Sequence, residues 1–184
     1  MDLADGSYTL GSELGQLWVK TARTGLGAKA GHDLTIEVTR WHGNATVDTS
    51  NPGNSSATVS IDVDSFEVRE GTGGVKPLTD GDRAQIKMTF REKILRTGQH
   101  PTISFQSTRV DGSADGFTIT GDLTIMGVTQ PVSLQCRAAD GKITGVATVA
   151  QTRWGIRPYS GFFGALKLRD EVGVTFDVVL TPQR

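Results

Sequence analysis

The stretch 117–136, FTITGDLTIMGVTQPVSLQC, constrains the fold more than any other part of the chain. Apolar and polar residues alternate in both of its halves, and a period of two is typical of antiparallel strands with one dry face and one wet face. The six residues between the halves, 126–131, include Gly127, which accepts a positive φ, and Pro131, which suits the start of a strand. The stretch therefore predicts a β-hairpin.

The same alternation recurs along most of the chain and predicts an all-β fold. A change of parity before Phe66 predicts a bulge near Asp64 and Ser65. About eight antiparallel strands with regular turns favour a closed barrel, because closure removes exposed strand edges. Such a barrel holds either side chains alone or one slender ligand, and the pattern does not choose between them. The further alternating segments are 7–10, 16–21, 33–42, 57–63, 102–108, 143–150 and 172–180.

One segment, 80–96 (DGDRAQIKMTFREKILR), predicts the main helix of the protein. Ile86, Phe90 and Ile94 recur every four residues, and Met88 widens the apolar face in this interpretation. The acidic start and basic end of the segment suit the helix dipole. We expect this helix to pack across the barrel.

Composition limits the class of protein. The chain of 184 residues fits one domain, which we place at 7–180, with flexible termini at 1–6 and 181–184. Its 19 basic and 20 acidic residues nearly balance, so no overall field attracts nucleic acid. No apolar run approaches the length of a transmembrane span. The opening MDLADGSYTL has neither the basic nor the apolar region of a signal peptide, so the sequence alone predicts a cytoplasmic protein.

No group of residues has the pattern of a catalytic or metal site. The three histidines, His32, His42 and His100, lack the short spacing that metal ligands usually share. His32 and Asp33 are neighbours, and they could pair only if a turn intervened. The single cysteine, Cys136, falls on the apolar face of its strand and is interpreted as a core residue. We therefore expect no catalytic residue, no metal and no cofactor.

Three stretches resemble the YceI-like polyisoprenoid-binding family: GDLTIMGVTQPV within 117–136, HPTISFQST at 100–108, and GIRPYSGFFGALKLRDEV at 155–172. Together they carry the resemblance over nearly the whole chain. The resemblance implies an elongated, lipocalin-like closed barrel around an isoprenoid chain. It also implies a bacterial protein, and many members of that family are exported.

The segment that begins at Trp154 gathers many apolar side chains between glycines. It fits two interpretations, a plug of core side chains at one barrel end or a lid over a lipid entrance. The resemblance favours the lid.

We therefore expect a non-enzymatic binding or carrier protein for a long apolar lipid, which by resemblance is a polyisoprenoid or an isoprenoid quinone. Two alternatives remain: an enzyme acting on a lipid-like substrate at the barrel mouth, through His32 or Asp33, and a ligand-free structural or stress-response protein. The sequence leaves a homodimer open. The residues expected to contact the ligand, which fit a solid core equally well, are Leu34, Ile36, Ile61, Phe105, Leu123, Ile125, Leu134, Phe162, Phe163, Val174 and Phe176.

Overall fold

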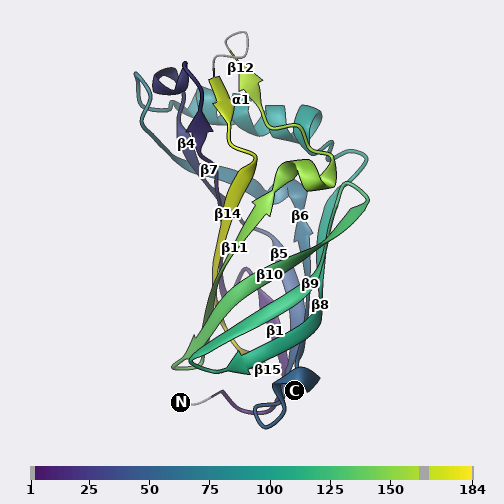
Figure 1. Cartoon of the computed structure of the whole chain (residues 1–184). Coiled ribbons are helices and arrows are strands. Elements are labelled where there is room, and N and C mark those ends of the chain that lie inside the picture. The colour runs from purple at the N-terminus through teal and green to yellow at the C-terminus, as the bar shows by residue number, and fades with distance from the viewer. Residues whose placement is uncertain (1–2, 162–165, 184) are drawn as a thin grey trace.

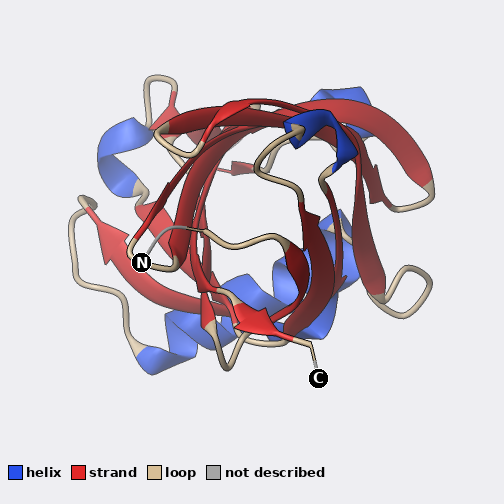
Figure 2. Cartoon of the chain, turned by 90° about the horizontal axis from the view of Figure 1, so that it is seen from below, coloured by secondary structure: helices blue, strands red, loops and turns tan. Residues whose placement is uncertain are grey.

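The computed structural model describes residues 3–161 and 166–183, and antiparallel strands make up most of this part of the chain. The strands of the main sheet are β1 (Gly6–Gly11), β2 (Gly15–Lys20), β4 (Asp33–Val38), β5 (Trp41–Val47), β6 (Ser56–Asp62), β7 (Phe66–Thr72), β8 (Thr102–Ser113), β9 (Gly116–Ile125), β10 (Val128–Ala139), β11 (Lys142–Ala150), β14 (Glu171–Val179) and β15 (Thr181–Pro182). Their order is β15-β1-β5-β6-β8-β9-β10-β11-β14-β2-β4-β7. Figures 1 and 2 show this sheet curving around a central axis.

Short elements complete the ends of the curved sheet. A small second sheet has the order β12-β13-β3 and lies near α1 at the upper end in Figure 1. Its strands are β3 (Arg23–Thr24), β12 (Ser160–Gly161) and β13 (Leu166–Leu168), and the short helices are η1 (Ala28–Ala30), η2 (Pro52–Asn54), η3 (Val63–Ser65) and η5 (Gln151–Trp154).

The prediction of an antiparallel β fold with one main helix is confirmed, but the prediction of about eight strands in one closed ring needs correction. The main sheet has twelve strands, because bends divide several long ones. Residues 12–14 separate β1 from β2, residues 39–40 separate β4 from β5, and η3 separates β6 from β7. At η3 the parity change expected near Asp64 takes the form of a 3-10 turn, in which the Asp62 carboxylate accepts the Asp64 amide at 2.9 Å.

The two ends of the strand order differ in their surroundings. At one end β15 pairs with β1, with Tyr8 opposite Pro182, and only Leu180 separates β15 from β14. At the other end β7 pairs with β4, and no other strand in residues 3–161 and 166–183 pairs with it. After Thr72 the chain leaves the sheet to form the helix. The sheet is thus barrel-like with a β7 edge. Gly6 belongs to β1, and Thr181–Pro182 form β15 at the end of the strand order. The sequence suggested that these residues were flexible.

The predicted hairpin is present, with a shorter turn than expected. Ile125 lies opposite Val128, so Met126 and Gly127 alone connect β9 to β10. Both have positive φ, 50° and 76°, which is typical of the two-residue turns that match strand twist. Pro131 therefore lies within β10. It is tolerated there because β11 pairs with β10 only from Gln135 onward, so no neighbour on that side needs its missing amide hydrogen.

The predicted helix consists of two parts. α1 (Asp80–Thr89) begins with a capping box between Thr79 and Asp82, and it continues into a π-helical segment, η4 (Phe90–Ile94). The Leu95 amide donates to the Phe90 carbonyl at 2.7 Å, which is the wider spacing of a π-turn. Phe90 is buried in the core, as the periodicity indicated. Met88 is 51% exposed, so its assignment to the apolar face was wrong.

Candidate functional site

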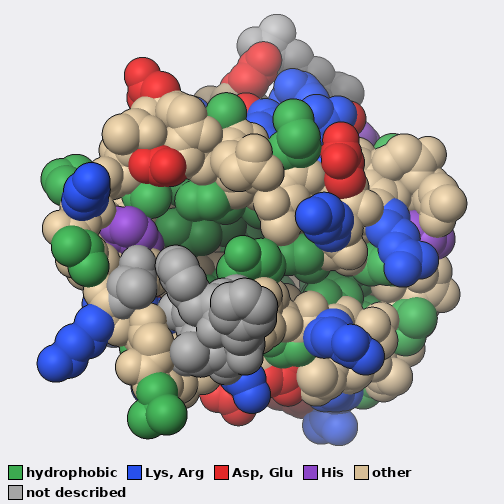
Figure 3. Space-filling model, turned by 90° about the horizontal axis from the view of Figure 1, so that it is seen from above, with side chains coloured by type: hydrophobic (Ala, Val, Ile, Leu, Met, Phe, Trp, Pro, Cys, Tyr) green, Lys and Arg blue, Asp and Glu red, His purple; other side chains and the backbone are tan. Residues whose placement is uncertain are grey.

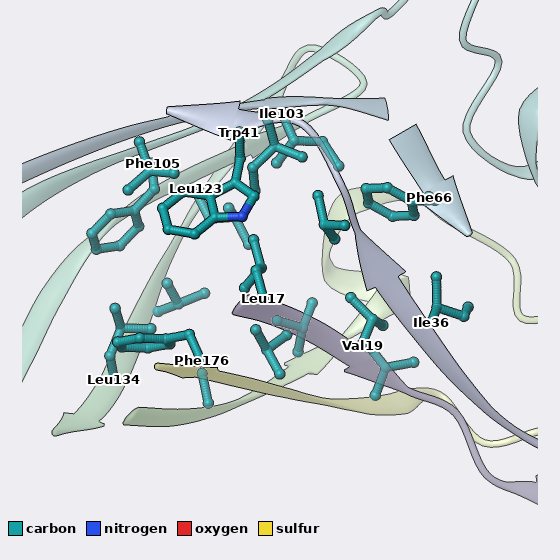
Figure 4. A pocket seen from close by; sticks show the side chains of 18 of the residues that line it. Leu17, Val19, Ile36, Trp41, Phe66, Ile103, Phe105, Leu123, Leu134 and Phe176 are labelled. Carbon is teal, nitrogen blue, oxygen red and sulfur yellow. The ribbon is translucent and has the colours of Figure 1, made fainter. Parts of the chain in front are cut away.

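The inward face of the sheet surrounds a cavity of about 1060 Å³. Side chains from the main sheet and from α1 and η4 line it, and they are predominantly aliphatic or aromatic. Figure 3 shows hydrophobic side chains inside a hollow at the end where α1 lies, and Figure 4 shows the lining side chains converging from several strands. Since alternate residues of a strand share a face, the period-two pattern of the sequence is what makes this wall apolar.

The structure brings the predicted contact residues together, as far as it describes them. Phe162 and Phe163 lie outside the described residues. The others all line the cavity: Leu34, Ile36, Ile61, Phe105, Leu123, Ile125, Leu134, Val174 and Phe176. That they bind a ligand stays a prediction.

The burial of these residues distinguishes a hollow interior from a solid one. Leu123, Leu134, Val174 and Phe176 contact the core cluster from the inner wall, yet each is only partly buried. In a close-packed core such side chains would have lost nearly all their exposure. The solid-core alternative is therefore wrong for the part of the protein described here.

Two aromatic rings lie against glycines of the neighbouring strand, so each ring lies along the surface of the sheet. Gly145 is opposite Phe176, and a Cβ atom at Gly145 would be 2.2 Å from Cζ of that ring. A Cβ atom at Gly121 would be 2.4 Å from Cζ of Phe105. Contacts this short do not occur between real atoms, so each ring occupies the space that a side chain on the glycine would need.

Several wall residues were not among those predicted. Leu17 and Val19 come from β2, Trp41 from β5, and Ile103 from β8, and all four line the cavity. The alternation of apolar and polar residues in 16–21 and 102–108 was the sequence pattern that could have identified Leu17, Val19 and Ile103. Trp41 had a weaker signal, because the bend before it interrupts the alternation of 33–42.

Ionised groups mark the two ends of the cavity. Hydrogen bonds from the backbone and hydroxyl of Thr79 lower the pKa of the exposed Asp82 carboxyl. Hydrogen bonds from the side chain of Asn54 and the backbone of Asn51 lower the pKa of the exposed Asp48 carboxyl. Both carboxylates line the cavity and remain charged at neutral pH.

The segment after β11 contributes both to the core and to the cavity. Trp154 and Ile156 belong to the buried core, and the indole N–H of Trp154 donates to the Leu123 carbonyl at 2.8 Å. Ile156, Tyr159 and Leu168 also line the cavity. The first residues of the segment therefore act as a plug. The remainder, 162–165, on which the lid interpretation depends, lies outside the described residues.

The candidate chemical groups occupy structural positions. Nε2 of His32 lies 2.6 Å from the Lys76 carbonyl oxygen, and His32 and Asp33 make separate contacts, since the Asp33 carboxylate accepts the Arg23 amide at 2.9 Å. Burial raises the pKa of the Cys136 thiol to about 12, so it stays protonated and unreactive at neutral pH. Within residues 3–161 and 166–183, no three His, Cys, Asp or Glu side chains gather as a metal site would require.

None of the helices in the part of the chain that the structure describes has the length and apolarity to cross a bilayer. The fold and the cavity together define a β-sheet protein with an internal apolar cavity.

The family model described as "YceI-like domain" matches residues 18–180, and the chain therefore belongs to the YceI-like family. It is similar to a UPF0312 protein of Yersinia enterocolitica, with 32% identity over 134 residues that cover 71% of this chain and 58% of that protein. It is also similar to Protein YceI of Escherichia coli, with 33% identity over 97 residues that cover 53% and 44% of the two chains. The matched part spans about half the length of these curated relatives.

Solved structures show the same fold. The crystal structure of Burkholderia cenocepacia BcnA superposes with a TM-score of 0.68 at 18% identity, covering 91% of this chain and 96% of that one. The Campylobacter jejuni YceI protein gives a TM-score of 0.59 at 12% identity, covering 81% and 84%. At these identities the likeness establishes the fold alone.

Proposed function

We propose that the protein is a non-enzymatic carrier that holds one long apolar lipid, a polyisoprenoid or an isoprenoid quinone, inside its barrel-like sheet. The observation that carries this proposal is the cavity of about 1060 Å³ with its aliphatic and aromatic wall. Each CH₂ group of a lipid that enters such a cavity gains about 0.8 kcal/mol from its removal from water. The isoprenoid chemistry rests on membership of the YceI-like family.

Strand pairings and contacts of the helix favour a ligand that does not leave through the side of the sheet. The pairings of β14 with β2 and of β15 with β1 bring the last strands against the first. At the β7 edge, Lys87 of α1 forms an ion pair with Glu67, and Arg91 of η4 pairs with Asp64 at 2.7 Å. These contacts hold the helix beside β7, which is one of the two terminal strands of the main sheet in the described residues. The ligand would then enter and leave through an end.

The direct test is organic extraction of gently purified protein followed by mass spectrometry, together with thermal unfolding in added lipid. A ligand that binds only the folded state raises the melting temperature once its concentration exceeds Kd. We expect a co-purified isoprenoid, and a rise in melting temperature with an isoprenoid quinone or polyprenol. Extracts free of isoprenoid, with a melting temperature that no isoprenoid changes, would refute the proposal.

Leu123→Phe is expected to reduce binding while leaving the empty protein stable. In a packed core an added ring costs about 1–3 kcal/mol, whereas here it can enter the cavity, so we expect a loss below about 1 kcal/mol. The ring would occupy ligand space, and at saturating lipid a tenfold weaker affinity removes about 1.4 kcal/mol of ligand stabilisation. Melting temperatures with and without lipid measure both effects.

Ser133→Phe is the matched control, because Ser133 is exposed on the outer face of the neighbouring strand β10. It should leave the response to lipid unchanged. A Leu123→Phe protein that is strongly destabilised when empty but still responds fully to lipid would contradict a ligand in this part of the cavity.

His32→Ala tests the enzyme alternative. His32 lines the cavity, but its ring is hydrogen-bonded to the Lys76 carbonyl, so we expect its removal to change the affinity for lipid by less than about threefold. Binding titrations and assays of lipid turnover, run on parent and variant, check this. A turnover of any added lipid that disappears in the variant would make the protein an enzyme.

A further inference from the structure

The two most exposed large apolar side chains in the part of the chain that the structure describes lie on neighbouring loops. Leu26 is 101% exposed and Val75 is 80% exposed. The loop of Leu26 leads to His32, and Nε2 of His32 lies 2.6 Å from the carbonyl oxygen of Lys76 in the loop of Val75. Apolar side chains that gather in this way at the surface are typical of an interaction site.

These loops lie at the end of the cavity where α1 lies, the end that Figure 3 shows. Val75 and Lys76 line the cavity, and so does Tyr159, an exposed residue of the segment after η5. The small sheet connects this segment to the first loop, because β3 pairs with β13 and the Leu168 amide donates to the Tyr159 carbonyl at 3.0 Å. We call four segments the rim of the cavity: 25–31, 73–78, 155–161 and 166–169.

Every charged side chain of the rim is basic. The whole chain is nearly balanced, with 19 basic and 20 acidic residues, yet the rim has five basic residues and no acidic one. All five are exposed, and none forms an ion pair with another residue in 3–161 or 166–183, whereas Arg23 beside the rim pairs with Asp33. The five are Lys29, Lys76, Arg157, Lys167 and Arg169.

The acidic residues that follow the rim are already engaged. Asp80 and Asp82 open α1, and the first pairs with Arg83 while the second accepts the Thr79 hydroxyl at 2.8 Å. The basic charge of the rim is therefore available to an anionic partner.

We propose that the rim is a docking surface for an anionic lipid bilayer, into which Leu26 and Val75 insert while the basic side chains contact lipid phosphates. Exposed apolar side chains among Lys and Arg are the combination by which proteins bind the surface of a membrane without crossing it. An acidic protein would satisfy the charges but would need a separate pocket for each apolar side chain, whereas the acyl region accepts both without one. Docking of this kind goes beyond the carrier function. It would place the open end of the cavity against the membrane.

Flotation of the parent protein with two kinds of vesicle tests the proposal. One is pure phosphatidylcholine, and the other contains equal parts of phosphatidylcholine and phosphatidylglycerol. We expect binding to the anionic vesicles, an affinity at least about tenfold lower for the neutral ones, and release as NaCl rises from about 0.1 M to about 0.5 M.

Two double variants separate charge from insertion. Lys29→Gln with Lys76→Gln should weaken binding to anionic vesicles by more than about tenfold, because each basic residue near such a surface contributes about fivefold. Leu26→Ser with Val75→Ser should weaken it by about tenfold through the loss of buried apolar area. Both pairs are exposed, so we expect the melting temperature of the parent.

Matched controls lie on the outer face of the main sheet. Val146→Ser removes a half-exposed valine from β11, and Arg137→Gln removes an exposed arginine from β10. Both should bind anionic vesicles as the parent does.

A parent protein that does not float with anionic vesicles would overturn the proposal, and this is the outcome expected if the rim contacts an acidic protein instead. Vesicle binding that neither double variant weakens would also overturn it. Both outcomes leave the carrier proposal intact, since extraction and melting temperature test that function without vesicles. Rim-dependent binding by a protein whose extract holds no isoprenoid would support the docking surface and count against the carrier alone.

Discussion

Replacing Phe90 by alanine is expected to lower the free energy of unfolding by about 3–5 kcal/mol, because a buried ring is lost and a cavity remains. Phe90 is buried where η4 begins, and its ring centroid lies 6.2 Å from that of Phe66 at the start of β7. The pair joins the helical segment to the edge of the sheet. Chemical denaturation of parent and variant measures the difference.

Met88→Ala serves as the control on the same helix, because Met88 is half-exposed. Its unfolding free energy should stay within about 0.5 kcal/mol of the parent value. Equal denaturant midpoints for the parent and Phe90→Ala would show that the helix does not depend on the sheet, which would contradict the packing described above.

Trp154→Ala is expected to destabilise by a similar amount, about 3–5 kcal/mol. Trp154 is only 1% exposed, and its indole N–H bonds to the Leu123 carbonyl. The variant therefore loses both a large buried ring and a buried hydrogen bond to the cavity wall. Thermal and chemical unfolding should both report the loss.

Two variants separate the contributions. Trp154→Phe retains most of the ring and should lose less, by removing chiefly the hydrogen bond, which contributes about 1 kcal/mol. Trp18→Ala removes a tryptophan that is only partly buried, and its effect should be smaller than that of Trp154→Ala. If Trp154→Ala were as stable as Trp18→Ala, the segment after β11 could not act as a plug.

The strands could be predicted from the sequence because alternating apolar and polar residues directly indicate which face of a strand is buried. It could not predict where long strands bend, since the break at residues 39–40 and the turn η3 depend on how neighbouring strands curve. The Met88 error has a simpler cause. Met88 is two residues from Ile86, and residues two apart lie on nearly opposite sides of a helix.

The cavity could not be predicted from the sequence, for a related reason. Leu123 and Phe176 have the same pattern whether the face they share meets other side chains or an empty space. Only the three-dimensional course of the strands decides how far apart opposite walls lie.

Two glycines that lie against the wall rings Phe176 and Phe105 help to set the width of the cavity. Phe176 lies flat only because Gly145 offers no side chain, and Phe105 has the same relation to Gly121. A methyl group added at Gly145 would lie 2.2 Å from Cζ of Phe176, so the ring would have to move and the cavity would change shape at that point. The width of the cavity at Phe176 and Phe105 therefore depends on two glycines that are not themselves among the residues that line it. In this protein, the side chains that the wall lacks help to determine the width of the cavity as much as those it has.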